Sequence, residues 1–360
     1  MIDFLVIGGG IAGTSAAARL SELGKVILLE AEDHLAYHAS GRSAALFEES
    51  YGKPATIALN KASRAYHVHA DVLSPRGLLL IGTKENATAF AHDQKHMTLD
   101  PITLAEARKL IPVLDTKIVD RAAYHTDAWD IDTDRLIQSF VRTTRQNGGQ
   151  IVTGAKVTGI TRSGNDWNIL CGLDAYSAHN IINAAGAWVD HIAKMAGITP
   201  LGFTPMRRSM ARIPAPNQLD VSAWPMLFGP GETWYAKPDA GALLVSPADE
   251  DPTDPHDAYA NNLTLAEGLD RYSKHVTAPV ERLLSSWAGL RTFAPDRNLV
   301  LGPDPDTPSF IWCAGQGGYG MQSSPGASQL LADIVAGRSS AIDKVHIDAL
   351  SPARFRNGGR

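Results

Sequence analysis

A glycine-rich run near the start of the chain has the residue types and the spacing to hold a phosphate group. Gly8, Gly10 and Gly13 form a G-x-G-x-x-G pattern. The first glycine permits a tight turn, the second lets the backbone approach a pyrophosphate, and the third lets a helix pack closely on a strand. Roughly 20 residues further on, the carboxylate of Glu30 can accept hydrogen bonds from a ribose diol. Together these residues predict a dinucleotide-binding site.

The elements around the glycines are those that such a site requires. The apolar run 3–7 predicts a buried strand, and the Ala-rich segment 14–23 predicts a helix whose N-terminus offers free N–H groups to phosphates. Residues 25–29 predict a second strand that ends at Glu30. A glycine turn without a ligand is the alternative, and the strand–turn–helix–strand order argues against it. Because the pattern starts at residue 3, we expect no signal peptide.

Composition narrows the class of protein. A chain of 360 residues can form two domains, or one large domain with an insertion. A net charge of −5 and the lack of a basic stripe argue against a nucleic-acid partner. No apolar run approaches the roughly 18 residues that a bilayer span needs, so we expect no integral membrane segment. Two cysteines, Cys171 and Cys313, cannot form a disulfide framework, and we expect a reduced, cytoplasmic protein.

Two groups of polar residues invite a metal hypothesis that the sequence does not support. His67 and His69 have no further ligands clustered with them. Asp130, Asp132 and Asp134 lack the glycine and the distal glutamate of a calcium loop. We expect no metal, and we expect these aspartates to cap the helix that follows.

Predicted strands and helices alternate over much of the chain. Strand-like runs lie at 77–82, 150–153, 167–170, 180–183, 242–246 and 309–314. Helical patterns lie at 104–111, 132–146, 189–196, 264–275 and 327–336. The region from about 200 to 282 is richer in Pro, Trp and Tyr and predicts short antiparallel strands. We therefore predict an α/β fold, with a Rossmann-like domain on a doubly wound sheet and a second domain on a largely antiparallel sheet.

A second glycine-rich turn, Gly315–Gln322, follows the predicted strand near the C-terminus. The strand at 180–183 likewise runs into the small residues 184–187, which allow a close approach by a cofactor. A nicotinamide dinucleotide usually needs only the first turn. Two such turns favour a larger cofactor such as FAD.

Besides Gly8–Gly13 and Glu30, the chain has distinctive segments at 37–45, 130–134, 183–188, 207–209, 235–241, 287–291 and 316–320. In this order, these segments resemble the D-amino-acid oxidase superfamily of flavoproteins and, within it, the bacterial D-arginine dehydrogenases. The resemblance covers most of the chain and implies a noncovalent FAD. It implies an FAD-binding domain from residues 1–82, 136–198 and 284–360, and a substrate-binding domain from residues 83–135 and 199–283.

The resemblance also implies which residues bind FAD. They are Gly8, Gly10, Ile11, Ala12, Gly13, Glu30, Ala31, Ser40, Gly41, Arg42, Ser43, Ala44, Ala45, Val157, Ala185, Gly186, Trp188, Gly317, Gly318, Tyr319, Gly320, Met321 and Gln322.

The catalytic residues that the resemblance implies would hold an amino acid against the flavin. Arg208 and Arg291 would clamp the substrate carboxylate, which a planar guanidinium grips through two hydrogen bonds. Tyr235 would donate to the same carboxylate, and Tyr51 would close over the substrate from a loop. Gly318 would place a carbonyl near the substrate amine. The implied reaction is hydride transfer from Cα to flavin N5, which gives an imino acid that hydrolyses to a 2-oxo acid.

Several features of this reaction stay open. We expect a D-amino acid, although the same clamp could serve L-amino acids or glycine-like substrates. The electron acceptor is oxygen or a quinone-type compound. The adjacent residue Arg207 points to the opposite side if the segment is a strand, so we expect a surface or structural role for it.

Two residues depart from the D-arginine dehydrogenase pattern. Leu46 stands where that enzyme has a histidine, and Leu78 stands where it has the acid that pairs with the basic side chain. An apolar pocket penalises a desolvated guanidinium, so we predict a neutral or N-substituted substrate. Alternatively, Glu48 and Glu49 on the loop could read a basic side chain and restore that preference.

Two further functions are rivals to catalysis on an amino acid. One is a non-catalytic subunit that holds FAD and relays electrons for a partner, which would have no need of a carboxylate clamp. The other is action on a modified amino group of a tRNA base, against which the acidic charge balance argues.

Overall fold

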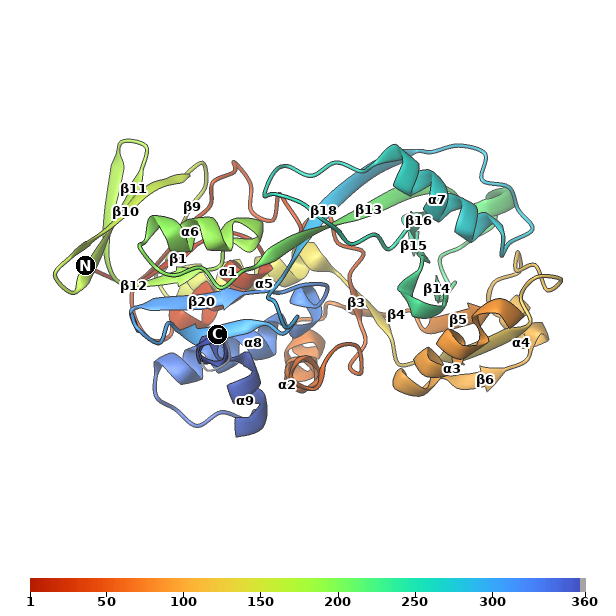
Figure 1. Cartoon of the computed structure of the whole chain (residues 1–360), viewed down its shortest axis with the longest axis horizontal. Helices are drawn as coiled ribbons and strands as arrows, with labels where there is room; N and C mark the ends of the chain where they lie inside the picture. Colours follow the sequence, from red (N-terminus) through yellow and green to blue (C-terminus); the bar gives the residue numbers. More distant parts are fainter. Residues whose placement is uncertain (357–360) are drawn as a thin grey trace.

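The computed structural model describes residues 1–356, which form two large sheets placed side by side along the long axis of the molecule (Figure 1). The first sheet has a parallel centre in the order β9–β2–β1–β12–β20, with antiparallel strands beyond it. Its strands are β1 (Ile2–Ile7), β2 (Val26–Leu29), β9 (Gln150–Val152), β10 (Val157–Ser163), β11 (Asp166–Cys171), β12 (Asp174–Asn183), β19 (Val300–Pro303) and β20 (Phe310–Ala314).

Apolar side chains cover both faces of this sheet, which explains why β1 is apolar almost throughout. Leu5 and Ile7 pack on one face with helix α6 (Val189–Met195). Phe4 and Val6 pack on the other face with α1 (Ile11–Leu20) and α8 (Gly320–Val335). A parallel sheet buried on both sides is the doubly wound arrangement that the alternation predicts.

Helix α2 (Pro54–His69) was not predicted, because its buried face is only weakly apolar. The buried positions include Ala55, Leu59, Ser63 and His67, which recur every four residues but mix apolar with polar side chains. This face packs against α8. The hydrophobic periodicity that identifies a helix is therefore hidden in the sequence.

The second sheet is largely antiparallel, as predicted, with one parallel pair between β14 and β5. Two long strands, β13 and β18, form an antiparallel pair at one side of this sheet (Figure 1). Its strands are β5 (Leu78–Gly82), β6 (Asp100–Ile102), β7 (Arg121–His125), β13 (Thr204–Pro214), β14 (Met226–Phe228), β15 (Tyr235–Asp239), β16 (Ala242–Ser246), β17 (Asp251–Pro252) and β18 (Ser285–Phe293). A third, small sheet joins β3 (Leu46–Phe47), β8 (Trp129–Ile131) and β4 (Leu73–Pro75).

The remaining helices surround these sheets. They are α3 (Ala87–His96), α4 (Leu104–Leu110), α5 (Thr133–Gln146), α7 (Asn262–Ser273) and α9 (Lys344–Leu350), with 3-10 turns at η1 (Lys84–Asn86), η2 (Gly186–Trp188), η3 (Pro216–Gln218), η4 (Pro230–Glu232) and η5 (Pro352–Phe355). Helix α8 begins seven residues earlier than the pattern at 327–336 indicates. Pro325 lies inside it, and the Ser324 hydroxyl donates to the Met321 carbonyl, which a proline nitrogen cannot serve.

Strands β5 and β18 fall in the ranges assigned to the FAD-binding domain, yet they pair within the second sheet. The division of the chain into domains stays a prediction. No helix within residues 1–356 combines the length and the apolar character needed to cross a bilayer.

Candidate functional site

Three turns that follow parallel strands meet at one edge of the first sheet. Gly8 follows β1, Ala184 follows β12, and Gly315 follows β20. Because the three strands are parallel neighbours, their carboxyl ends lie at the same edge, where α/β proteins bind nucleotides. A cavity of about 950 Å³ opens there.

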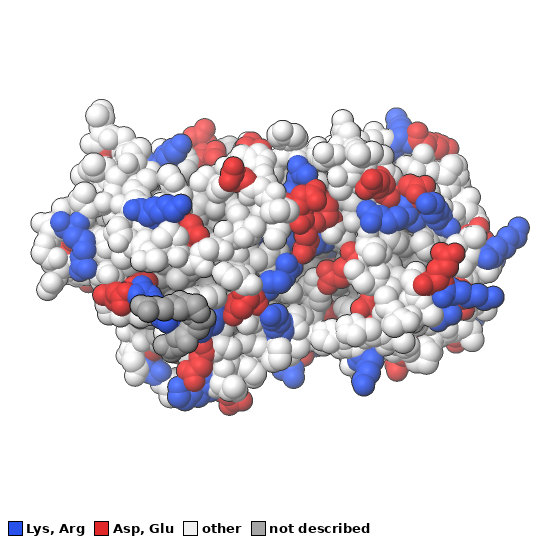
Figure 2. All heavy atoms as spheres, viewed as in Figure 1, with Lys and Arg blue, Asp and Glu red and all other residues white. Residues whose placement is uncertain are grey.

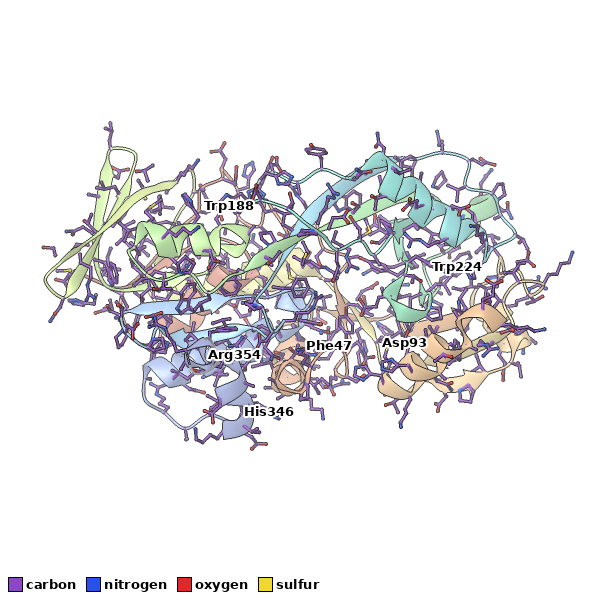
Figure 3. The ribbon with its side chains drawn as sticks, in the orientation of Figure 1. Phe47, Asp93, Trp188, Trp224, His346 and Arg354 are labelled. Atoms are coloured by element: carbon purple, nitrogen blue, oxygen red, sulfur yellow. The ribbon has the colours of Figure 1, made fainter. Side chains whose placement is uncertain are left out.

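Ten of the predicted FAD-binding residues line this cavity. They are Gly8, Gly10, Glu30, Ala31, Ser40, Arg42, Val157, Ala185, Gly186 and Trp188. The predicted residues of the C-terminal turn lie elsewhere, and two of them, Gly318 and Tyr319, border a second cavity. Trp188 lies at the upper side of the first half of the molecule, on η2 (Figure 3).

The glycines of the first turn are required by close backbone contacts. Gly8 has a φ of +108°, and a Cβ there would lie 2.5 Å from the Ala184 carbonyl oxygen. A Cβ on Gly13 would overlap the carbonyl oxygen of Gly8. These positions leave bare backbone facing the cavity at the N-terminus of α1, which is suited to a pyrophosphate.

Glu30 is fixed by backbone donors at the end of β2. Its carboxylate accepts from the Gly9 N–H at 2.6 Å and from the Glu32 N–H at 2.9 Å. The side chain is 9% exposed and lines the cavity, so its remaining lone pairs can accept from a ribose diol. The bare glycine backbone, the helix N-terminus and this acid fit an FAD.

The second cavity, of about 430 Å³, brings together four of the five predicted catalytic residues: Tyr51, Arg208, Arg291 and Gly318. Tyr235, the fifth, is buried on β15 and does not line the cavity, but it is near enough to Arg291 to help raise the pKa of that guanidinium. These residues come from five separate parts of the chain, so the fold rather than the local sequence assembles them.

Strand pairing puts the two arginines on one face of the second sheet. Arg291 of β18 is paired with Met206 of β13, and Arg208 lies two residues further along β13. Positions two apart on a strand share a face, so the two guanidinium groups are diagonal neighbours. Arg207 faces the other way and pairs with Asp251 at 2.7 Å, at the edge of the sheet.

The charges in this cavity are unequally compensated. Glu250 pairs with Arg208 at 3.1 Å and with Arg297 at 2.8 Å. Within residues 1–356, Arg291 has no carboxylate partner within ion-pair distance. Burial opposes its charge, but Tyr235, Tyr51 and the two nearby glutamates raise its pKa above the ordinary value. A partly buried cation without a carboxylate partner is suited to bind a substrate carboxylate.

Tyr51 lies on a loop that several side chains hold in place. The Asn60 amide donates to the Tyr51 carbonyl at 3.0 Å, and the Gln322 amide donates to it at 3.4 Å. The Tyr51 ring lies 5.1 Å from that of Tyr319. Burial and then the charge of Glu232 raise the pKa of Tyr51 well above its usual range, so its hydroxyl stays protonated and can donate.

Three residues that line the second cavity have strained backbone, and no sequence motif marks them. Glu232, Ala248 and Arg297 all have positive φ values, between 52° and 63°. The Asp93 carboxylate on α3, labelled in Figure 3, accepts from the Gly231 N–H at 2.6 Å and anchors the loop that bears Glu232. Such backbone strain is common at functional sites.

Glu232, Glu250, Phe293 and Arg297 line the cavity, and no motif marks them. They lie in loops or at a strand end, and only their spatial neighbours reveal them. Figure 2 shows acidic and basic side chains gathered between the two halves of the molecule.

The three predicted substrate-pocket residues do not border this cavity. Leu78 is 2% exposed in an apolar cluster against which Leu46 packs. Glu48 is buried and lies 2.9 Å from the Nε2 of His125. Glu49, the other acid of the alternative, pairs with Arg64 on α2 at 3.1 Å. Their role in substrate choice stays a prediction.

Two negative expectations concern metals and thiols. The described part of the chain contains no group of three or more potential metal-ligating side chains. His67 is fully buried and contacts the Gln322 carbonyl. Asp132 caps α5 as predicted, whereas Asp134 lies within the first turn and Asp130 instead pairs with Arg76 and Lys237. Cys313 is 2% exposed, and burial raises the pKa of its thiol to about 12, so it behaves as a buried apolar residue.

Comparison with known proteins identifies the family. The family model described as "DAO: FAD dependent oxidoreductase" matches residues 3–334. The cattle FAD-dependent oxidoreductase domain-containing protein 1 is 23% identical, over 92% of this chain and 81% of its own. Human mitochondrial dimethylglycine dehydrogenase is also 23% identical, and the match spans 96% of this chain and 44% of that protein.

Solved structures share the whole fold. The L-proline dehydrogenase of P. horikoshii has a TM-score of 0.85 at 20% identity and covers 99% of this chain and 98% of its own. The glycine oxidase of Geobacillus kaustophilus has a TM-score of 0.82 at 20% identity, with 95% and 96% covered. These likenesses confirm the fold, and a special closeness to D-arginine dehydrogenase stays a prediction.

Proposed function

The chain belongs to the DAO family of FAD-dependent oxidoreductases, and on that premise we propose that it oxidises an amino acid, of D configuration, at its Cα–N bond. When bound, FAD supplies the hydride acceptor, at flavin N5. The imino acid that is released then hydrolyses to a 2-oxo acid. Electrons leave the protein to oxygen or to a quinone-type acceptor.

The observation that carries this proposal is the uncompensated guanidinium of Arg291 in the second cavity. It would bind the substrate carboxylate through two hydrogen bonds, with Arg208 beside it on the same sheet face. A non-catalytic electron relay has no use for such an unpaired, partly buried cation. A clamp of this kind fixes orientation, which supplies much of the rate of a transfer between bound partners.

The other predicted residues have roles that fit their positions. The protonated hydroxyl of Tyr51 can donate to the carboxylate from the loop side. Tyr235 does not line the cavity, but it is near Arg291 and would donate from the sheet side. The Gly318 carbonyl would accept from the substrate amine, which must be neutral to lose hydride readily. The protein then orients and desolvates, while the cofactor carries the redox chemistry.

We propose that the substrate is an amino acid with a neutral side chain or a substituted amino nitrogen. The apolar cluster that contains Leu78 also contains Tyr235, and Ala248 packs on it while lining the cavity. The two acids of the alternative, Glu48 and Glu49, are engaged by His125 and Arg64.

A basic substrate has one specific observation in its favour. Glu232 lines the cavity and has no ion-pair partner within residues 1–356. It is thus an acid that a cationic side chain could reach. Glu232 would then bind the basic side chain, in place of Glu48 and Glu49.

The test is anaerobic mixing of the purified yellow protein with D-, L- and N-methyl amino acids that have neutral, acidic and basic side chains. We expect rapid loss of the flavin absorption band with neutral D- or N-substituted members. Admission of air then separates an oxidase from a dehydrogenase. If the flavin is bound and no member bleaches it, the proposal is wrong and the electron-relay alternative is supported.

A further inference from the structure

The FAD cavity is closed on one side by a segment from the other half of the molecule. Residues 253–260, which we call the clasp, connect β17 to α7. Five of them, Thr253, Asp254, Pro255, His256 and Ala258, line the 950 Å³ cavity. The second sheet thus supplies one wall of a cofactor site. The part of that site which we call the cradle is formed by Gly8–Gly13, Glu30 and the loop 37–42.

The clasp is fixed at both ends to rigid elements. The Thr253 N–H donates to the Pro205 carbonyl on β13 at 3.0 Å. At the other end Asn261 caps α7 by accepting from the N–H groups of Leu263 and Thr264. The middle of the clasp has irregular backbone, so its position over the cavity depends on what it contacts there.

One guanidinium joins the middle of the clasp to the cradle. Arg42, which lines the cavity, donates to the Ala258 carbonyl at 2.9 Å and pairs with the Asp257 carboxylate at 2.5 Å. It also donates to the Tyr37 carbonyl at 3.1 Å and to the Ala288 carbonyl on β18 at 3.0 Å. A single side chain therefore ties together three segments that are far apart in the sequence.

Asp257 makes a second contact with the cradle loop. The Tyr37 hydroxyl donates to its other carboxylate oxygen at 3.1 Å, and the His38 Nδ1 lies 4.0 Å away. Both oxygens of Asp257 are thus directed at residues 37–42, the segment that runs past the glycine turn. Beside this polar contact, Ala258 packs in a small apolar cluster with Ala187 and Ala288.

We infer that Asp257 latches the clasp over bound FAD and thereby slows the release of the cofactor. Asp257 does not line the cavity itself and acts through Arg42 and Ala258, so it is a positioning residue. A latch of this kind holds two halves of the molecule around one ligand. Opening it would free one wall of the site without disturbing the glycine cradle.

The experiment measures FAD release from the purified holoprotein, as the rise in flavin fluorescence after dilution. We expect Asp257→Asn to speed release roughly three- to tenfold, because it removes the charge from a half-exposed, charge-assisted pair. Tyr37→Phe removes one hydrogen bond to Asp257 and leaves the ion pair with Arg42, so it should have a smaller effect of the same sign. Added salt should speed release from the wild type more than from Asp257→Asn, because the pair is screened.

Asp251→Asn is the matched control. Asp251 pairs with Arg207 at 2.7 Å, and the side chains are 52% and 19% exposed, against 58% and 16% for Asp257 and Arg42. This pair spans β17 and β13 and does not reach the cradle. Release at the wild-type rate from both Asp257→Asn and Tyr37→Phe would overturn the inference. Equal acceleration by Asp251→Asn would overturn it too, since the effect would then be general. FAD release is measured without a substrate, so failure of the proposed reaction would not affect this test.

Discussion

The two cavities of this protein differ in the kind of atoms that line them. The FAD cradle is mainly backbone: glycines at 8, 10 and 13, the start of α1, and an acid held by N–H groups. The second cavity, the proposed substrate site, is mainly side chain: three arginines, two glutamates and two tyrosines on separate elements. The cradle presents almost fixed geometry, whereas the substrate cavity depends on which charges are paired with which.

This difference indicates how each cavity should respond to substitutions. Backbone shape is set by a few positions that tolerate no side chain, so a small substitution should abolish binding. A set of paired and unpaired charges can be altered one residue at a time, and each change should move affinity or preference by a limited amount. The predictions below try to break or refine this contrast.

We expect the largest effect from Gly13→Ala in the cradle. The added methyl group would overlap the Gly8 carbonyl oxygen, and a backbone atom cannot move aside without displacing β1 from α1. The variant should be isolated without FAD, as shown by loss of the flavin absorption band. Gly159→Ala is the control, because the new methyl group meets only the flexible Leu170 side chain at 3.3 Å. Normal flavin content in Gly13→Ala would contradict the backbone account of the cradle.

The second prediction concerns the substrate cavity. Arg291→Met should lower kcat/KM roughly 10²- to 10³-fold while the flavin spectrum stays intact, because the substrate carboxylate loses its partly buried charged partner. The measurement is steady-state kinetics together with the absorption spectrum. Arg207→Met serves as the control, since that guanidinium faces away and pairs with Asp251. Loss of flavin in Arg291→Met would show that the arginine is structural, and the contrast between the cavities would fail.

The contrast also explains how much could be predicted from the sequence. The cradle was predictable because its glycines, its helix and its acid follow one another within about thirty residues. The second cavity is assembled from residues as distant as Tyr51 and Gly318, so only the family resemblance pointed to them. Glu232 and Arg297 carried no signal, because nothing local distinguishes a loop glutamate that faces a cavity from one that faces solvent.

The third prediction tests the contact between α2 and the start of α8. His67 on α2 is buried against the Gln322 carbonyl near the start of α8, and burial lowers its pKa from 6.5 to about 4. A histidine with a lowered pKa resists protonation in the folded state, so stability is full above pH 6.5 and is lost as the pH falls towards 4. The loss should reach about 3 kcal/mol of unfolding free energy at the acidic end.

Replacement of that histidine should remove this part of the pH dependence. We expect the free energy of unfolding of His67→Gln to vary less between pH 6.5 and 4 than that of the wild type, as measured by denaturant titration. His69→Gln, on the exposed side of the same helix, should keep the wild-type profile. Parallel profiles for His67→Gln and the wild type would mean that other groups cause the acid sensitivity.

The smallest effect concerns substrate choice at the mouth of the second cavity. Glu232 is exposed and has no ion-pair partner in the described part of the chain, so its contribution to binding a cation should be modest. We expect Glu232→Gln to lower kcat/KM for a basic amino acid roughly three- to tenfold and to leave that for a neutral one unchanged. Glu49→Gln should leave the ratio of the two unchanged, because Glu49 is held by Arg64 outside the cavity. If Glu49→Gln rather than Glu232→Gln shifts the ratio, Glu49 binds the basic side chain and Glu232 does not. The loop that carries Glu49 and Tyr51 would then determine the side-chain preference.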